Sequence, residues 1–161
     1  MTSTFRLALA VLLIGITAGD VFAQMSMPEA RAFFVNRTRV SFSSGHGTQV
    51  SYMAPNGAVY LWYPGNRVVL PGSWSLEPRA MPGYPPRAYA ILCFQYGPNT
   101  YNPVTGRGGG GPECGPADRW ARYAVDQAPG DVFGLARRQS PPFILTPERT
   151  TIAELRRRMS R

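Results

Sequence analysis

Cys93 and Cys114 are the two residues of this chain whose types and spacing most directly predict a covalent bond. Cys93 lies in an apolar stretch and Cys114 follows a run of turn-forming residues. The alternatives are a reactive thiol or a metal site, but the sequence has no C-x-x-C pair and a single histidine to complete a ligand set. In an exported chain such a pair forms a disulfide. We therefore predict a Cys93–Cys114 bond that closes the loop 93–114.

His46 is the residue best suited to acid–base chemistry, because it is the only histidine of the chain. It lies between Gly45 and Gly47, directly after Ser43 and Ser44, so a Ser–His nucleophile pair is conceivable. Neighbours in one turn rarely present nucleophile and base to each other, and no G-x-S-x-G elbow is present. We expect a polar turn residue, and an enzyme that uses His46 is the third of our three functional hypotheses.

Other catalytic signals in the sequence are weak. The glycines of 108–111 resemble a phosphate loop, but the Lys-Ser/Thr ending is missing. The nine carboxylates are scattered, and none can be paired at the separation that glycoside hydrolysis needs. The sequence therefore predicts a protein without catalytic residues, metal site or cofactor.

The basic residues point to an anionic partner. All 17 are arginines, the net charge is +8, and Arg156, Arg157 and Arg158 follow one another near the C-terminus. A surface of this charge favours an anionic glycan or lipid surface. Export makes nucleic acid an unlikely partner, and a basic surface with no dedicated ligand is the alternative.

Aromatic side chains are the remaining candidates for ligand contact. Tyr60 and Trp62 alternate with apolar residues in 58–63, so they share one face of a strand. Such a face can line a ligand site or belong to the core, and the sequence leaves both alternatives open.

These residues must be positioned by strands. Short segments rich in Val, Tyr, Trp and Leu are separated by Pro-Asn-Gly, Pro-Gly-Asn and Pro-Gly turns between residues 49 and 96. The fold class is therefore mainly β, a small antiparallel barrel or curled sheet of about seven or eight strands. The expected strands are 38–43, 48–53, 58–63, 67–70, 72–77 and 88–96, the last of them central, followed by a hairpin of 119–126 and 132–136. The segment 119–126 would also make an acceptable helix.

Two helices and two irregular stretches complete the expected domain. A short N-terminal helix is predicted within 26–36, and a basic C-terminal helix starts at Thr146 or at Thr151. In that helix Ile152, Leu155 and Met159 share the face that would dock on the sheet. The prolines of 78–87 and the glycines of 98–116 predict loops.

The first 23 residues read as a signal peptide. Arg6 precedes the apolar run 7–18, and Val21-Phe22-Ala23 provides a cleavage site before Gln24. The run is too short to span a bilayer, which takes about 20 residues. We therefore expect a mature chain of one β-rich domain, residues 24–161, with no transmembrane segment, in the periplasm or the medium of a bacterium.

Several short motifs resemble those of small exported proteobacterial β-domain proteins of unknown function. They are a strand Tyr before an Asn-Gly turn (Tyr52, Asn56-Gly57), a Gly-x-Trp strand (72–74), Leu92-Cys93-Phe94 and a second cysteine. The resemblance covers about residues 28–126, and the Pro-rich and Gly-rich stretches depart from it. It implies an exported β-domain and no activity.

Three functional hypotheses follow. The first is a non-catalytic exported binding or accessory domain that recognises an anionic envelope component or an envelope protein. The second is an inhibitor of an extracellular hydrolase that inserts a loop such as 97–116 into its target. The third is the enzyme that uses His46.

Overall fold

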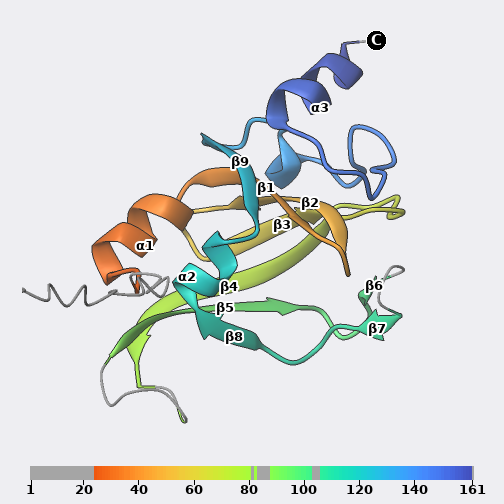
Figure 1. Cartoon of the computed structure of the whole chain (residues 1–161). Helices are drawn as coiled ribbons and strands as arrows, with labels where there is room; N and C mark the ends of the chain where they lie inside the picture. Colours follow the sequence, from red (N-terminus) through yellow and green to blue (C-terminus); the bar gives the residue numbers. More distant parts are fainter. Residues whose placement is uncertain (1–23, 81, 83–87, 103–105, 161) are drawn as a thin grey trace, which may run out of the picture.

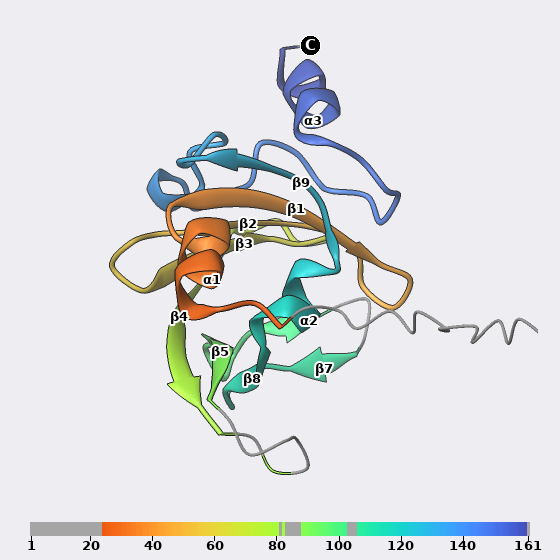
Figure 2. The ribbon, with the colours of Figure 1, turned by 60° about the vertical axis from the view of Figure 1, so that its left-hand side comes forward.

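A seven-stranded antiparallel sheet organises the protein, in the order β8-β5-β4-β3-β2-β1-β9. The computed structural model describes residues 24–80, 82, 88–102 and 106–160. The sheet curls into a half-barrel, and its two ends are joined by the short link between β8 and β9 (Figures 1 and 2). Its strands are β1 (Arg37–Ser43), β2 (Gly47–Met53), β3 (Ala58–Trp62), β4 (Leu70–Arg79), β5 (Tyr89–Tyr96), β8 (Glu113–Pro116) and β9 (Ala124–Pro129).

The strands follow the alternation and the turns of the sequence. Gly57, in the turn between β2 and β3, has a φ of 84°, a conformation that glycine adopts without strain. In β4, Trp74 and Leu76 turn toward the core while Ser73 and Ser75 are exposed. The mainly β class and the curled sheet are therefore confirmed.

The inner, concave face of the sheet carries one hydrophobic core. The helices α1 (Met27–Phe34) and α2 (Ala117–Ala121) pack there against β2 to β5. Phe34, Met53 and Leu92 have no exposed surface. Figure 2 shows α1 and α2 within the curl of the sheet.

The outer, convex face of β1 to β3 carries a second core, covered by the C-terminal segment 130–155, which we call the strap. The strap contains the 3₁₀ turn η1 (Leu135–Arg137), and the helix α3 (Ile152–Met159) begins at its end. The buried core residues on this side are Val40, Val50, Trp62, Val69, Phe133, Leu135, Leu145, Ile152 and Leu155. Consequently β1 to β3 are buried on both faces.

Both predicted helices form and both begin with a capping box. At α1, Ser26 and Glu29 exchange side-chain and backbone hydrogen bonds, and at α3 Thr151 and Glu154 do the same. Of the two predicted starts of the C-terminal helix, Thr151 is therefore confirmed.

Several predicted elements were wrong in detail. The expected strand 67–70 is a turn up to Leu70, where β4 begins, and β5 lies next to the edge strand β8 and not at the centre. The expected loop 98–116 contains a small hairpin, β6 (Tyr101–Asn102) with β7 (Arg107–Gly108), as well as β8. The expected loop 78–87 begins later, because β4 runs to Arg79, and most of it lies outside the described residues.

The predicted hairpin of 119–126 and 132–136 does not form. Residues 117–121 are helical, β9 pairs with β1, and 132–136 leads into η1. Asp131 explains the turn, because its carboxylate accepts hydrogen bonds from the backbone N–H groups of Leu135 and Ala136 at 2.8 and 2.9 Å. That bonding favours a helical turn over an extended strand.

Candidate functional site

Arg156, Arg157 and Arg158 form an exposed basic cluster on α3. The helix is fixed beneath them, because Ile152 and Leu155 are buried while all three arginines are exposed. Met159 was expected to dock on the sheet together with Ile152 and Leu155, but it is 41% exposed. Figures 1 and 2 show α3 projecting away from the sheet. The cluster is thus held out at one end of the molecule.

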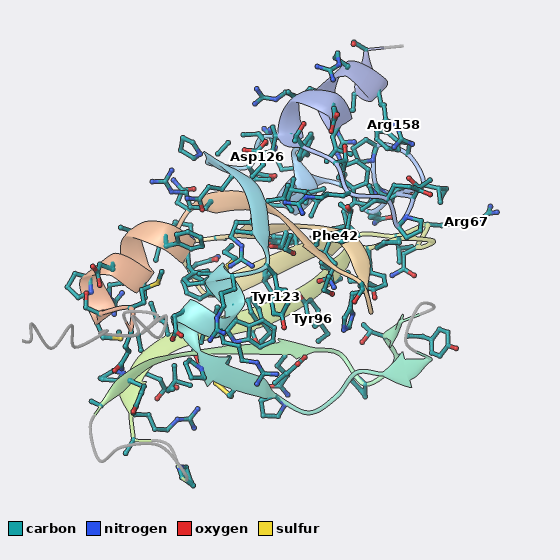
Figure 3. The ribbon with its side chains drawn as sticks, in the orientation of Figure 1. Phe42, Arg67, Tyr96, Tyr123, Asp126 and Arg158 are labelled. Atoms are coloured by element: carbon teal, nitrogen blue, oxygen red, sulfur yellow. A yellow bond between two sulfur atoms is a disulfide. The ribbon has the colours of Figure 1, made fainter. Side chains whose placement is uncertain are left out.

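The base of α3 is anchored by a carboxylate from the sheet. Asp126 on β9 accepts a hydrogen bond from the backbone N–H of Ile152 at 2.9 Å, and it lies below α3 in Figure 3. The N-terminus of a helix favours a negative group, because its first N–H groups have no partner within the helix. The orientation of the basic cluster is therefore set by β9.

A polar hollow of about 320 Å³ lies beside the cluster. It is lined by Thr146, Glu148, Arg149, Thr150, Glu154, Arg157 and Arg158. Two of its arginines rest on aromatic rings, Arg158 at 4.1 Å from the centre of Phe143 and Arg149 at 5.9 Å from that of Phe42. These contacts hold cationic side chains at the rim of the hollow.

The carboxylates in this hollow are engaged locally. Hydrogen bonds from Thr146 lower the pKa of Glu148, and hydrogen bonds from Thr150 and Thr151 lower that of Glu154. Both groups are ionised at neutral pH and their oxygens accept from hydroxyl groups. They offset part of the positive charge without an ion pair within 4 Å in the described part.

Across the described residues, carboxylates bond more often to backbone N–H groups at helix starts than to arginines. There the one ion pair within 4 Å joins Arg122 to Asp118, at 3.5 Å. Four carboxylates instead accept hydrogen bonds from backbone N–H groups at helix starts, those of Glu29, Asp126, Asp131 and Glu154. Because these carboxylates bond to N–H groups of the backbone, they lower the local positive charge without forming ion pairs within 4 Å with the three arginines of α3.

Arg39 is a second unusual cation, and the sequence did not indicate it. It lies on β1 facing the inside of the half-barrel and is 4% exposed. Its guanidinium lies over the Phe34 ring at 4.7 Å, and its Nε and Nη1 atoms have no hydrogen-bond partner. Burial lowers the pKa of Arg39 to about 10, so the group stays charged at neutral pH.

Tyr96 on β5, labelled in Figure 3, interacts electrostatically with Arg39. Its ring lies over Gly72, where a Cβ atom would come within 2.7 Å of the ring. Burial raises the pKa of Tyr96 well above its ordinary value, and the charge of Arg39 opposes that rise. The phenol is therefore neutral at physiological pH.

The two candidate ligand-facing aromatics occupy different environments. Trp62 has no exposed surface and its Nε1 donates to the carbonyl oxygen of Phe143 at 3.0 Å, which places it in the outer core. Tyr60 is half-buried and stacks on Tyr52, with ring centres 6.3 Å apart. A ligand can reach Tyr60 but cannot reach Trp62 while the strap is in place.

His46 connects the turn between β1 and β2 to the end of β3. Its Nδ1 is 2.9 Å from the Tyr63 hydroxyl, and the two rings meet edge to face with centres 6.2 Å apart. The backbone N–H of His46 donates to the carbonyl oxygen of Ser43 at 3.2 Å. These contacts give the side chain a role in fixing the turn, and its lack of a catalytic role stays a prediction.

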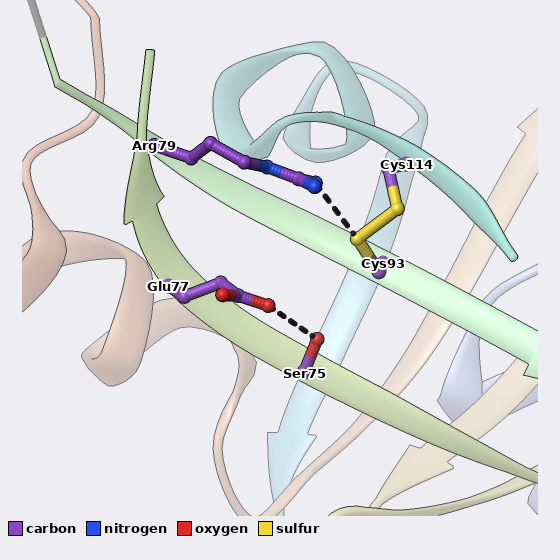
Figure 4. The surroundings of a disulfide bond; sticks show 5 residues. All are labelled: Ser75, Glu77, Arg79, Cys93 and Cys114. Carbon is purple, nitrogen blue, oxygen red and sulfur yellow. Dashed lines mark hydrogen bonds between the residues drawn. A yellow bond between two sulfur atoms is a disulfide. The ribbon is translucent and has the colours of Figure 1, made fainter. Parts of the chain in front are cut away.

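The predicted disulfide is present. Cys93 on β5 and Cys114 on β8 are directly opposite in register, with a Cα–Cα distance of 4.0 Å. Figure 4 shows Arg79 donating from Nη2 to the Cys93 sulfur at 3.3 Å, beside the Ser75–Glu77 pair. Cys114 therefore belongs to a strand and not to a flexible loop, and the bond fastens the edge strand β8 to β5.

Within the ranges that the structure describes, no three His, Cys, Asp or Glu side chains gather as a metal site would require. The helices of those ranges include none that is long and apolar enough to cross a membrane. The predicted signal peptide, 1–23, lies outside them. Comparisons of the chain with protein-family models, curated proteins and solved structures give no match, so the resemblance to exported β-domain proteins stays a prediction.

Proposed function

We propose that this chain is an exported, non-catalytic binding domain that recognises an anionic component of the bacterial cell envelope through the basic cluster on α3. The observation that carries the proposal is that Arg156, Arg157 and Arg158 are exposed side by side on an anchored helix. The carboxylates nearest to them are engaged with hydroxyl groups and backbone N–H groups. A disulfide supports an oxidising location such as the periplasm or the medium.

The chemistry of the cluster fits a phosphate- or carboxylate-bearing surface. Arginine presents several N–H donors in a planar fork that matches these groups. The side chains of Ile144 and Met159 are 46% and 41% exposed, and Ile144 directly follows Phe143, on which Arg158 rests. Basic groups beside apolar side chains suit the interface of an anionic lipid layer.

The test compares two variants of equal charge. In the first, Arg156, Arg157 and Arg158 are changed together to Gln; in the control, the exposed and separated Arg31, Arg67 and Arg79 are changed to Gln. Each arginine near an anionic surface contributes about 1 kcal/mol, so we expect the first variant to lose about 100-fold in affinity for phosphatidylglycerol vesicles. The control should lose much less, because its arginines do not act on one patch.

Vesicle co-sedimentation and retention on immobilised heparin measure this difference at several salt concentrations. Binding through the cluster weakens with salt, and its salt dependence flattens in the cluster variant. Equal losses in both variants would show that net charge alone is responsible. Unchanged binding in both would leave an envelope protein as the preferred partner.

A second candidate function is inhibition of an extracellular hydrolase, and one observation favours it. The hairpin of β6 and β7 stands at one end of the molecule (Figure 1), next to the disulfide-fastened pair β5–β8, and Tyr101 on it is 59% exposed. A rigidly based loop with an exposed aromatic anchor suits insertion into a cleft. Inhibition of lysozyme or a trypsin-like protease that is lost in Tyr101→Ala would support this function, and its absence across such a panel would remove it.

A further inference from the structure

The guanidinium of Arg39 is a buried cation whose hydrogen-bonding capacity is unused. Its Cζ is 4.7 Å from the centre of the Phe34 ring and 5.9 Å from that of the Phe33 ring. Aromatic rings interact with the face of a guanidinium, whereas its N–H groups point outward in its plane. Nε and Nη1 are buried and have no hydrogen-bond partner, so the stacking leaves at least two donor atoms unsatisfied.

Such an arrangement is costly in a folded protein. Unsatisfied buried donors and an unpaired buried charge both destabilise the native state. Among the described residues no carboxylate lies within 4 Å of Arg39. The ionisable group that interacts electrostatically with it is the phenol of Tyr96, which is neutral at physiological pH. A residue of this kind is retained either for packing or for a ligand that supplies the missing acceptor.

A hollow of about 430 Å³ lies between α1, β9 and the segment before α1, and Arg39 is not one of its lining residues. It is lined by Gln24, Met25, Glu29, Ala32, Phe33 and Gln127. Phe33 belongs to both features, because it lines the hollow and its ring centre is 5.9 Å from the Arg39 Cζ. Gln127 is the register partner of Arg39 across β1 and β9, so both side chains leave the sheet on the same face.

We propose that the hollow and Arg39 together form a binding site for an anionic amphiphile, a molecule with one acidic head group on an apolar body. Because Phe33 lines the hollow and Arg39 does not, the head group accepts hydrogen bonds from the Arg39 guanidinium after the Phe33 side chain shifts aside. The apolar body lies along Met25, Ala32 and Phe33. Gln127, which is exposed, is placed to donate to the head group as it enters.

This site is separate from the basic cluster of the proposed function. Arg39 faces the inner side of the half-barrel, whereas α3 stands at the end of the strap on the outer side. The cluster offers exposed charge to an extended surface, and the Arg39 site offers one buried charge to one molecule. Each proposal can therefore fail without the other.

Glu29 is the one acidic residue among those lining the hollow. Its carboxylate accepts hydrogen bonds from the backbone N–H and the hydroxyl of Ser26, at 2.7 and 2.6 Å, and hydrogen bonds from Ser26 lower its pKa. It therefore weakens the attraction for an anion without occupying Arg39. Gln at this position keeps the capping box and removes the charge.

The experiment measures the binding of decanoate, decanol and acetate to the wild-type protein by isothermal titration calorimetry. We expect decanoate to bind one to one, acetate to bind very weakly because it lacks the apolar body, and decanol to bind at least tenfold more weakly than decanoate because it lacks the charge. Equal affinity for decanoate and decanol, or no binding of decanoate, would overturn the proposal. This comparison of head groups uses the unchanged protein and does not depend on any variant folding.

Two variants locate the site. Arg39→Met keeps the length and the contact with Phe34 but removes the donors, so it should fold, as circular dichroism checks, and lose decanoate binding. Glu29→Gln should bind decanoate a few-fold more tightly. Undiminished decanoate binding by folded Arg39→Met would show that Arg39 serves packing alone. Arg67→Gln, at an exposed arginine outside both sites, is the matched control, and its decanoate affinity should equal that of the wild type.

Discussion

The two faces of the curled sheet differ in how completely their buried polar groups are bonded. On the outer face they are bonded to the strap: the Thr38 hydroxyl donates to the carbonyl oxygen of Gly130 at 2.6 Å, that of Thr48 to Glu148 at 2.5 Å, and the Trp62 Nε1 to Phe143 at 3.0 Å. On the inner face Trp74 Nε1 donates to the carbonyl oxygen of Ala54 at 3.0 Å, whereas Arg39 Nε and Nη1 and Trp120 Nε1 are buried without a partner. Asn66 Nδ2, in the turn after β3, is a further such atom. Among the unsatisfied groups of the described residues Arg39 is the charged one, so its missing partners carry the largest energetic cost.

The outer face also shows why the strap stays in place without regular pairing. Its backbone joins the sheet at widely spaced points, such as Thr48 N–H to Pro147 at 3.0 Å, Gly65 N–H to Leu145 at 3.0 Å and Val69 N–H to Gln139 at 2.7 Å. Between these points its apolar side chains fill the outer core. The strap therefore contributes to the stability of the fold through both hydrogen bonds and apolar contacts.

The largest expected loss of stability comes from a substitution in the outer core. Trp62→Ala removes the largest buried side chain and the hydrogen bond to Phe143, and should lower the free energy of unfolding by about 3–5 kcal/mol. Urea denaturation followed by circular dichroism measures it. A loss below about 1 kcal/mol would show that the strap is not part of the cooperative fold.

The disulfide is expected to come next. It fastens the short edge strand β8, so replacing Cys93 and Cys114 together with Ser should cost about 3 kcal/mol by releasing a loop in the unfolded chain. The melting temperature of the double variant should match that of the reduced wild-type protein. Two alkylatable thiols in native protein isolated without reductant would contradict the bond itself.

A smaller effect sharpens the comparison at a single polar group. The Thr38 hydroxyl donates to Gly130 and accepts from the backbone N–H of Val132 at 3.1 Å. Thr38→Val leaves both strap groups unsatisfied and should cost about 1–3 kcal/mol. The exposed Thr146→Val is the control, and chemical denaturation should show it close to the wild type.

The smallest effect concerns the inner face and appears only at high pH. Burial raises the pKa of Tyr96 in the folded state above its value of about 10 in the unfolded chain. Stability linked to Tyr96 is then complete below about pH 10 and is lost as the pH rises further, because the unfolded chain releases the proton first. Tyr96→Phe should leave stability at pH 7 nearly unchanged and make its decline above pH 10 less steep in urea titrations. An identical decline in both proteins would contradict the buried position of this phenol.

Local signals in the sequence were sufficient for much of the fold. Asn56-Gly57 predicted the turn between β2 and β3, and Thr151 with Glu154 predicted the start of α3. The disulfide was predicted correctly because the chain has two cysteines, so each has one possible partner. These features depend on neighbours a few residues apart or on residue type, so the sequence carries them directly.

Elements whose neighbours are remote were predicted less well. Val132, Phe133 and Leu135 have the spacing of a strand, but they pack on β1 to β3 and the turn after them is fixed by Asp131. The basic cluster could be predicted from three consecutive arginines, and the capping box of Glu154 from its spacing to Thr151. Capping of α3 by Asp126 joins residues 26 positions apart, which no local pattern reveals.

The sequence by itself determined that β1 alternates, with Val40 on one face and Arg39 on the other. An alternating strand ordinarily presents its polar face to water. Only the curl of the sheet and the docking of α1 turned that face into an interior, where Arg39 is 4% exposed. The burial of Trp62 likewise depends on the strap, because its Nε1 donates to Phe143, which lies 81 residues further along the chain. Alternation sets which side chains share a face, and long-range packing decides what covers that face.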